Sequence, residues 1–167
     1  MPIIVNKVGA HRNGEALSRV VYYMMTSNYF KAGNCRGVWE YSPLGNVNGF
    51  EFVKEMYGKS DGKQVSHLVI GTKHEGLIEE ELIGAGESAL DYLYGNGFQC
   101  CYAFHRGSGE DPGYLHLHMA VNTVNFRDGK RFYETYNAVT GLRNYLAALY
   151  NSWQWSTAYD DSCIWED

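Results

Sequence analysis

The segment at residues 115–121, Leu-His-Leu-His-Met-Ala-Val, sets two histidines two positions apart in an otherwise apolar run. A short apolar run of this length predicts a strand that is buried on both faces or nearly so. Side chains two positions apart on a strand point to the same side, so His116 and His118 project together from a rigid element. The chain must therefore form a covered sheet that carries two imidazoles on one of its faces.

The preceding apolar run, at residues 98–105, ends at a third histidine, His105. The polar loop between the two runs is too short for a crossover helix, so the two strands are expected to be antiparallel neighbours. His105, His116 and His118 could then hold one divalent cation and leave positions open for water or substrate. Zn²⁺ is the default ion for three imidazoles, whereas Mg²⁺ or Mn²⁺ is favoured if the substrate supplies phosphate oxygens. The alternative is that the three are partly buried histidines with hydrogen-bond partners.

Other polar residues near these strands could support the histidines or could have ordinary structural roles. The connecting loop contains Glu110 and Asp111, whose carboxylates could orient a histidine ring, although this glycine-rich stretch is also typical of a solvated loop. His67, in an apolar run at 65–73, is expected to pack or to form a hydrogen bond within the sheet. His11 and His74 are expected to be ordinary loop residues.

The order of the remaining apolar patterns predicts the fold class. Strands are expected at 2–8, 36–41, 65–73, 98–105 and 114–124, and helices at 14–27, 47–57, 75–93 and 138–152. An Asp-Gly pair at 128–129 predicts a hairpin turn. The prediction is an α+β fold, with a mainly antiparallel five-stranded sheet flanked by helices in two or three layers. Residues 1–167 are expected to form a single domain, either as a minimal protein or as the N-terminal part of a longer one.

The first predicted helix, at 14–27, leaves two tyrosines off its apolar face. Asn13 can cap this helix, and Leu17, Val20 and Met24 follow helical spacing. At about 100° per residue, Tyr22 and Tyr23 fall on opposite flanks of that stripe. Because neither tyrosine is needed for the core, both are expected at the surface.

The net charge of −5 argues against a simple electrostatic nucleic-acid binder, which would usually be basic. A local basic patch can still hold a nucleic-acid backbone on an acidic domain. The four cysteines form no CxxC pair, which favours reduced thiols and a cytoplasmic protein. No apolar run reaches the ~18 residues of a membrane span, so no membrane association is expected.

His105, the motif His116-Leu117-His118 and the downstream pattern Asn122-x-x-Asn125-x-x-x-Gly129-Lys130 resemble conjugative relaxases. These are the mobilisation nucleases of plasmids and integrative elements, within the HUH endonucleases. The segment at 18–26, Ser-Arg-Val-Val-Tyr-Tyr-Met-Met-Thr, is similar to the tyrosine motif of the family, and it implies Tyr23 as the nucleophile with Tyr22 as the alternative. The chain departs from the family pattern in its longer 106–113 loop, in its acidic charge and in lacking a helicase, primase or other C-terminal region.

The resemblance implies a metal-dependent nuclease that nicks single-stranded DNA at an origin of transfer through a 5′-phosphotyrosine and later rejoins the strand. It also implies an accessory DNA-binding protein and a conjugation coupling protein as partners. Basic and aromatic side chains would bind the strand; the candidates are Arg12, Arg19, Lys31, Arg36, Arg106, Arg127, Lys130 and Arg131, with Tyr29, Phe30, Trp39, Phe126 and Tyr133.

Other functions fit parts of the same pattern. A rolling-circle replication initiator or a single-strand transposase would share the histidines and the tyrosine. A metal-dependent small-molecule hydrolase would use metal-bound water and would not need Tyr23. A DNA-binding module without nicking activity would need no metal at all.

Overall fold

A computed structural model describes residues 3–72, 79–109, 111–132 and 136–159 of the chain. Its strands are β1 (Ile3–Val8), β2 (Phe30–Arg36), β3 (Val65–Thr72), β4 (Cys100–Arg106), β5 (Leu115–Asn122) and β6 (Trp155–Tyr159). Its helices are α1 (Ala16–Thr26), α2 (Pro43–Met56), α3 (Glu79–Gly95) and α4 (Tyr136–Leu149). The predicted α+β class with a mainly antiparallel sheet is confirmed.

The six strands form one sheet in the order β2-β4-β5-β3-β1-β6. Every pairing is antiparallel except that of β1 with β6, which is parallel. The sequence predicts four of these strands, β1, β3, β4 and β5, but places the second strand at 36–41 instead of Phe30–Arg36. It misses β6, because the segment around it has no clear alternation. The Asp128-Gly129 turn is confirmed by an antiparallel bridge between Val124 and Arg131.

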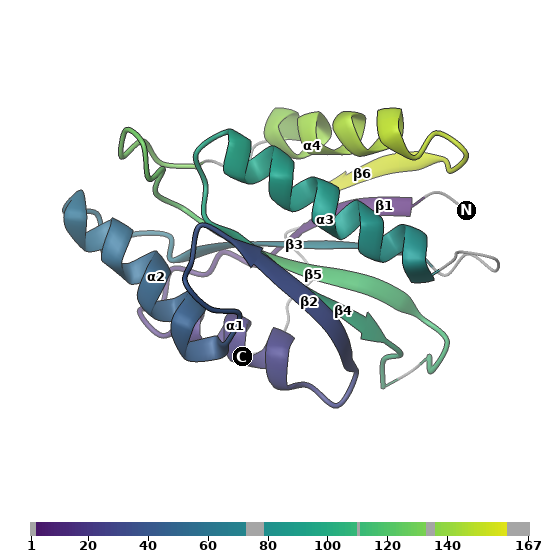
Figure 1. Ribbon diagram of the computed structural model, residues 1–167, viewed down its shortest axis with the longest axis horizontal. Coiled ribbons are helices and arrows are strands. Elements are labelled where there is room, and N and C mark those ends of the chain that lie inside the picture. Colours follow the sequence, from purple (N-terminus) through teal and green to yellow (C-terminus); the bar gives the residue numbers. More distant parts are fainter. Residues whose placement is uncertain (1–2, 73–78, 110, 133–135, 160–167) are drawn as a thin grey trace.

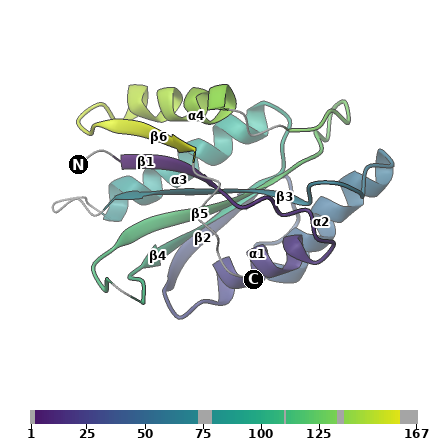
Figure 2. The same ribbon diagram turned by 180° about the vertical axis from the view of Figure 1, so that it is seen from behind.

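Helices cover both faces of the sheet, which gives three layers (Figure 1). Helices α3 and α4 lie over one face, and α1 lies against the opposite face with α2 packed beside it (Figure 2). Alternation along β4 divides its side chains between the two layers. Cys100 and Tyr102 face the core under α3, whereas Cys101 and Ala103 face the core under α1.

Two element boundaries differ from the prediction. The second strand ends at Arg36, where the sequence predicts it to begin, because Gly37 takes a positive φ of 79° and turns the chain off the sheet. Helix α2 begins earlier than predicted, at Pro43. Ser42 caps it by accepting a hydrogen bond from the Gly45 amide at 3.0 Å, and proline suits a first helical position.

Helix α1 begins at Ala16, two residues after the predicted start. Asn13 does not occupy the N-cap position, but its side-chain oxygen accepts from the Glu15 amide at 2.8 Å. In the described part of the chain, no helix is long and apolar enough to cross a membrane.

Candidate metal and nucleophile site

The register of β4 and β5 brings the three predicted histidines together. His105 lies directly opposite His116, and Ala103 lies opposite His118, so all three imidazoles emerge on the face covered by α1. All three side chains are buried, and a ligand nitrogen from each lies within 4.8 Å of the other two. The sequence prediction that these residues form one cluster agrees with this geometry.

The nitrogen positions fit a shared cation. The Nε2 atoms of His116 and His118 lie 3.1 Å apart. If two nitrogens each lie ~2.1 Å from one ion and the N–ion–N angle is a right angle, the nitrogens are about 3.0 Å apart. The donor set is three neutral nitrogens, which suits a borderline transition ion better than a hard one.

A backbone contact fixes the proton on His105. Its Nε2 lies 2.6 Å from the Met24 carbonyl oxygen, so Nε2–H is the donor. The other nitrogen, Nδ1, is buried and has no hydrogen-bond partner among the described residues. A neutral ring therefore keeps a lone pair on Nδ1, as a metal ligand requires.

Burial also holds these rings in the neutral form that coordinates a metal. It lowers the pKa of His105, lowers the pKa of His116 to about 4, and lowers the pKa of His118 well below its usual range. The neighbouring histidines add to the effect at His116 and His118, because a charged imidazole would repel the next one. At neutral pH, no proton competes with a metal for these nitrogens.

A fourth histidine joins the cluster from the next strand. His67 on β3 is buried, and its Nε2 lies 2.9 Å from Nδ1 of His118. With Nδ1–H of His118 as the donor, Nε2 of His118 keeps its lone pair for a metal, which is how a neighbouring group commonly orients a ligand histidine. Burial lowers the pKa of His67 itself to about 3, so it remains a neutral acceptor.

His67 was predicted to hydrogen-bond within the sheet, and it does, but the prediction missed that its partner is a candidate metal ligand. His11, predicted to be an ordinary loop residue, instead places its ring 5.6 Å from the His67 ring. It also adopts a positive φ of 47°, which is uncommon outside glycine. Local sequence could not predict these contacts, because only the pairing of β3 with β5 brings His67 beside His116 and His118.

Tyr23 lies beside the histidines at the end of α1. Its ring is edge-on to His118 with the centroids 5.4 Å apart, and its centroid lies 5.8 Å from that of His105. The side chain is 38% exposed, so it faces both the cluster and solvent. Partial burial, and secondarily Tyr29, raise the pKa of its phenol. Tyr22 is also exposed, at 44%, but within the described residues its ring makes no contact with the cluster.

Asp111 does not orient a histidine. Its carboxylate accepts from the Gly113 amide at 2.9 Å, and its amide donates to the Ser108 hydroxyl, so it shapes the loop between β4 and β5. The solvated-loop alternative is therefore correct for Asp111. Glu110, His74 and Tyr133 lie outside the described residues.

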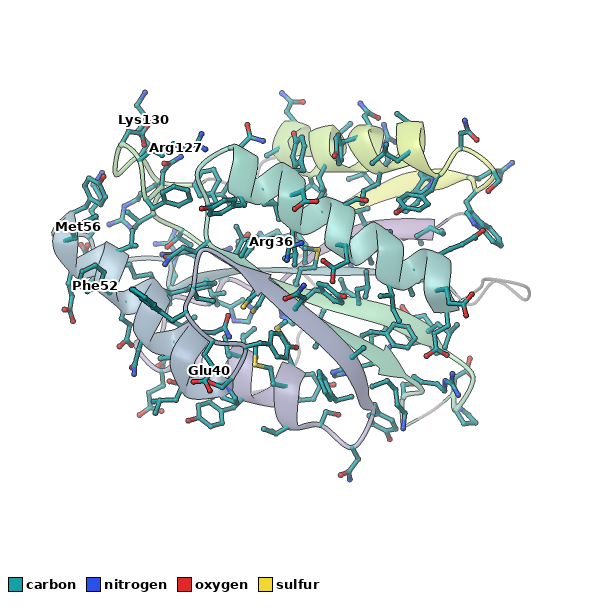
Figure 3. All side chains as sticks on the ribbon, in the orientation of Figure 1. Arg36, Glu40, Phe52, Met56, Arg127 and Lys130 are labelled. Carbon is teal, nitrogen blue, oxygen red and sulfur yellow. The ribbon has the colours of Figure 1, made fainter. Side chains whose placement is uncertain are left out.

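Several of the basic residues predicted to bind DNA already have acidic partners. Arg36 pairs with Glu87 and Asp91, Arg106 pairs with Glu79, and Arg131 pairs with Asp61. These ion pairs leave less of their charge available to a phosphate. Arg127 and Lys130 make no ion pair among the described residues, and they lie on the loop after β5 rather than at the histidines (Figure 3).

A comparison with protein families identifies a match that covers most of the chain. The family described as "Relaxase: MobA/VirD2-like, nuclease domain" matches residues 23–155. The matched range begins at Tyr23 and includes His67, His105, His116 and His118. No curated protein sequence gives a significant match.

Proposed function

Because this chain belongs to the MobA/VirD2-like relaxase nucleases, we propose that it nicks single-stranded DNA at an origin of transfer with Tyr23 as the nucleophile. The observation that carries the proposal is the meeting of Tyr23 with the histidine cluster. Helix α1 and strands β4 and β5 are far apart in sequence, yet the Tyr23 ring packs against His105 and His118. A phosphate placed beside the phenol would also lie beside the histidines.

The chemistry follows from these groups. The Tyr23 oxygen attacks the phosphorus, the bond from phosphorus to the 3′ oxygen breaks, and the phenol proton is finally carried by that 3′ oxygen. The product is a 5′-phosphotyrosine with a free 3′-hydroxyl, and attack by a 3′-hydroxyl on the phosphotyrosine rejoins the strand. A divalent ion held by His105, His116 and His118 would supply positive charge next to the non-bridging phosphate oxygens.

The proton of Tyr23 needs an acceptor during attack, because its phenol already has a raised pKa. His118 faces the Tyr23 ring, but its Nδ1 bonds to His67 and its Nε2 faces His116. The bound DNA or a water molecule is therefore the acceptor in our proposal. His105 has a different task, since its bond to Met24 holds the residue after the nucleophile.

The ion we propose is Mg²⁺ or Mn²⁺, because the phosphate would complete its coordination with oxygens; Zn²⁺ is the alternative. Imidazole nitrogens favour Mn²⁺ over Mg²⁺, and within the described residues no carboxylate joins the three histidines. We expect Mn²⁺ to bind the metal-free protein more tightly than Mg²⁺. Isothermal titration calorimetry with each ion tests this order.

The proposal extends to the setting of the reaction. The partners are single-stranded DNA at an origin of transfer, an accessory DNA-binding protein and a conjugation coupling protein, and the location is the cytoplasm. We further propose that residues 1–167 act as one nuclease domain. The parallel pairing of β1 with β6 supports this, because it joins segments from near both ends of the chain in one sheet.

The decisive experiment incubates the protein with labelled single-stranded origin oligonucleotides and Mn²⁺. We expect a DNA–protein adduct that survives boiling in detergent and is absent in Tyr23→Phe. Tyr22→Phe is the matched control, since it removes a neighbouring exposed hydroxyl from the same helix, and it should keep the adduct. An adduct lost in Tyr22→Phe but kept in Tyr23→Phe would assign the nucleophile to Tyr22. Absence of an adduct on every origin sequence of the source element would refute nicking, and metal-dependent hydrolysis that survives in Tyr23→Phe would favour the small-molecule hydrolase.

A further inference from the structure

A second feature lies at the other end of the strands that hold the histidines. A groove of about 560 Å³ opens beside Gln99, which immediately precedes β4, whereas His105 lies near the far end of that strand. Six residues of extended chain separate the two positions, or about 20 Å at ~3.3 Å per residue. The groove is therefore distinct from the candidate metal site.

Gln99 lies on the floor of this groove, and both polar atoms of its side chain already form hydrogen bonds. Its side-chain nitrogen donates to the carbonyls of Gly37 and Gly49, both at 3.0 Å, and its oxygen accepts from Asn122 at 2.7 Å. The two glycines add no side chain to the groove. A ligand seated here would be held mainly by the walls.

The walls are aromatic and open to solvent. Trp39 is fully exposed, and Phe52 on α2 is 67% exposed. Tyr94 at the end of α3 and Phe126 after β5 complete the set, with their rings 5.3 Å apart. Large apolar side chains gathered at one open site mark a binding surface, whereas a single exposed one does not.

A basic side chain, Arg127, lies beside the aromatic wall of the groove. The Arg127 guanidinium lies 5.5 Å from the centre of the Phe126 ring, and one of its N–H groups donates to the Gly95 carbonyl. These contacts position the guanidinium without neutralising it. Figure 3 shows Arg127 and Lys130 on the loop after β5, on the same side of the molecule as Phe52 of α2, and Glu40, which lines the groove, lies apart from them.

We propose that this groove binds unpaired nucleotides of a single DNA strand whose nick site lies at Tyr23; the proposal rests on the function proposed above. Bases stack on Trp39 and Phe52, and the adjoining phosphates approach Arg127 and Lys130. Aromatic faces beside uncommitted cations match a nucleic-acid strand, which offers a flat ring and an anion in every unit. Glu40, away from the cations, is placed to accept from an amino group of a base.

The test measures binding without chemistry, in a Tyr23→Phe background with a metal chelator. Fluorescence anisotropy follows fluorescein-labelled thymidine oligonucleotides of increasing length. Trp39→Leu and Phe52→Leu should each weaken binding of the long oligonucleotides about 10-fold, since stacking on one aromatic ring typically contributes this much. Oligonucleotides too short to span both the groove and the Tyr23 site should show at most a small difference in affinity between the parent and these variants.

The cations are tested by the salt dependence of the same binding. Arg127→Ala and Lys130→Ala should each reduce the slope of log affinity against log salt by about 1. Leu149→Ala and Arg143→Ala are the controls, because they remove an exposed apolar and a partly exposed basic side chain from α4. They should change neither the affinity nor its salt dependence. Trp39 is fully exposed, so its variant should fold normally, which circular dichroism checks.

Three outcomes would overturn the groove proposal. The first is that long oligonucleotides bind all groove variants as tightly as the parent, and the second is an equal loss of affinity for short and long oligonucleotides. The third is self-association of the parent through Trp39 with a DNA affinity that is independent of Trp39, which would make a second copy the occupant. The groove proposal and the nicking proposal fail separately. If DNA binding depends on Trp39 but the parent forms no adduct, the proposed function is refuted and the groove proposal stands. If the parent forms an adduct but DNA binding does not depend on Trp39, the groove proposal is refuted and the proposed function stands.

Discussion

The two ends of the β4–β5 pair are built for opposite tasks. At one end, four imidazoles from β3, β4 and β5 are buried against each other, and the His105 and His118 ring centroids are only 4.6 Å apart. At the other end, Trp39 and Phe52 stand open to solvent over a glycine floor. One ladder of backbone hydrogen bonds thus carries a closed, nitrogen-rich centre and an open aromatic groove.

The difference between the two ends separates chemistry from affinity. A metal ligand must be neutral and fixed before the substrate arrives, and burial provides both at the histidines. A stacking surface must be reachable, so the groove keeps large apolar side chains in water until a strand covers them. If this division is correct, each end can be disabled while the other still works.

The largest expected effect comes from removing a proposed metal ligand. His118→Ala should lower Mn²⁺ affinity by more than about 100-fold, because even partners of ligands commonly account for 10–100-fold. Calorimetric titration measures the metal, and anisotropy in a chelator measures single-stranded DNA binding, which should persist. A joint loss of both, with a native circular dichroism spectrum, would show that the two ends are not independent.

His67→Ala should lower Mn²⁺ affinity about 10- to 100-fold, less than loss of a ligand, because His118 would lose the acceptor that fixes its proton. His67→Asn offers a side-chain oxygen in place of the ring nitrogen and should recover part of the affinity. The same calorimetric titration compares the three proteins. If the alanine variant binds Mn²⁺ like the parent, His67 has only a packing role.

Acid should destabilise the metal-free protein through its buried histidines. The pKa of His67 falls from 6.5 to about 3 on folding, and that of His116 to about 4. The unfolded chain therefore binds more protons between these values, so stability is present above pH 6.5 and is lost as the pH falls below it. The expected slope is about 1.4 kcal/mol per pH unit for each such histidine, to be measured by urea unfolding in a chelator. His67→Asn should flatten the slope, and unfolding that does not change between neutral and mildly acid pH would contradict the burial of these rings.

The smallest effect is expected at Asp111, between the two strands. Asp111→Ala should change Mn²⁺ affinity by no more than about 0.5 kcal/mol, because its carboxylate bonds to the Gly113 amide and not to an imidazole. Proteolysis of the loop provides a second measurement, and should be faster in the variant. A large loss of metal affinity would restore the orienting role that the sequence suggested for this carboxylate.

Local patterns predicted the centre better than the groove. The alternation of His116 and His118 and the short loop back to His105 were enough to place three imidazoles on one face. The surface exposure of Tyr23 was also predicted, because this residue falls off the apolar stripe of α1. Its contact with His118 depends on how α1 crosses the sheet, which no local period encodes.

The partners of these residues depended on long-range pairing. His67 reaches His118 only because β3 pairs with β5 in a register that sets Val69 opposite His118. The groove brings together Trp39, Phe52, Tyr94 and Phe126 from four separate segments. Strand β6 formed against β1 without an alternating pattern, because a parallel partner at the edge supplied its hydrogen bonds.

The hydrogen bond from His105 to the Met24 carbonyl has a consequence for how this nuclease can vary. Met24 follows Tyr23 directly, so a single bond across 81 residues ties the end of α1 to β4. The spacing between Tyr23 and the histidines is then set by this hydrogen bond and not by the length of the Ser27–Tyr29 turn. Insertions in that turn should be tolerated in related chains, whereas a change that shifts the backbone at Met24 should misplace the tyrosine.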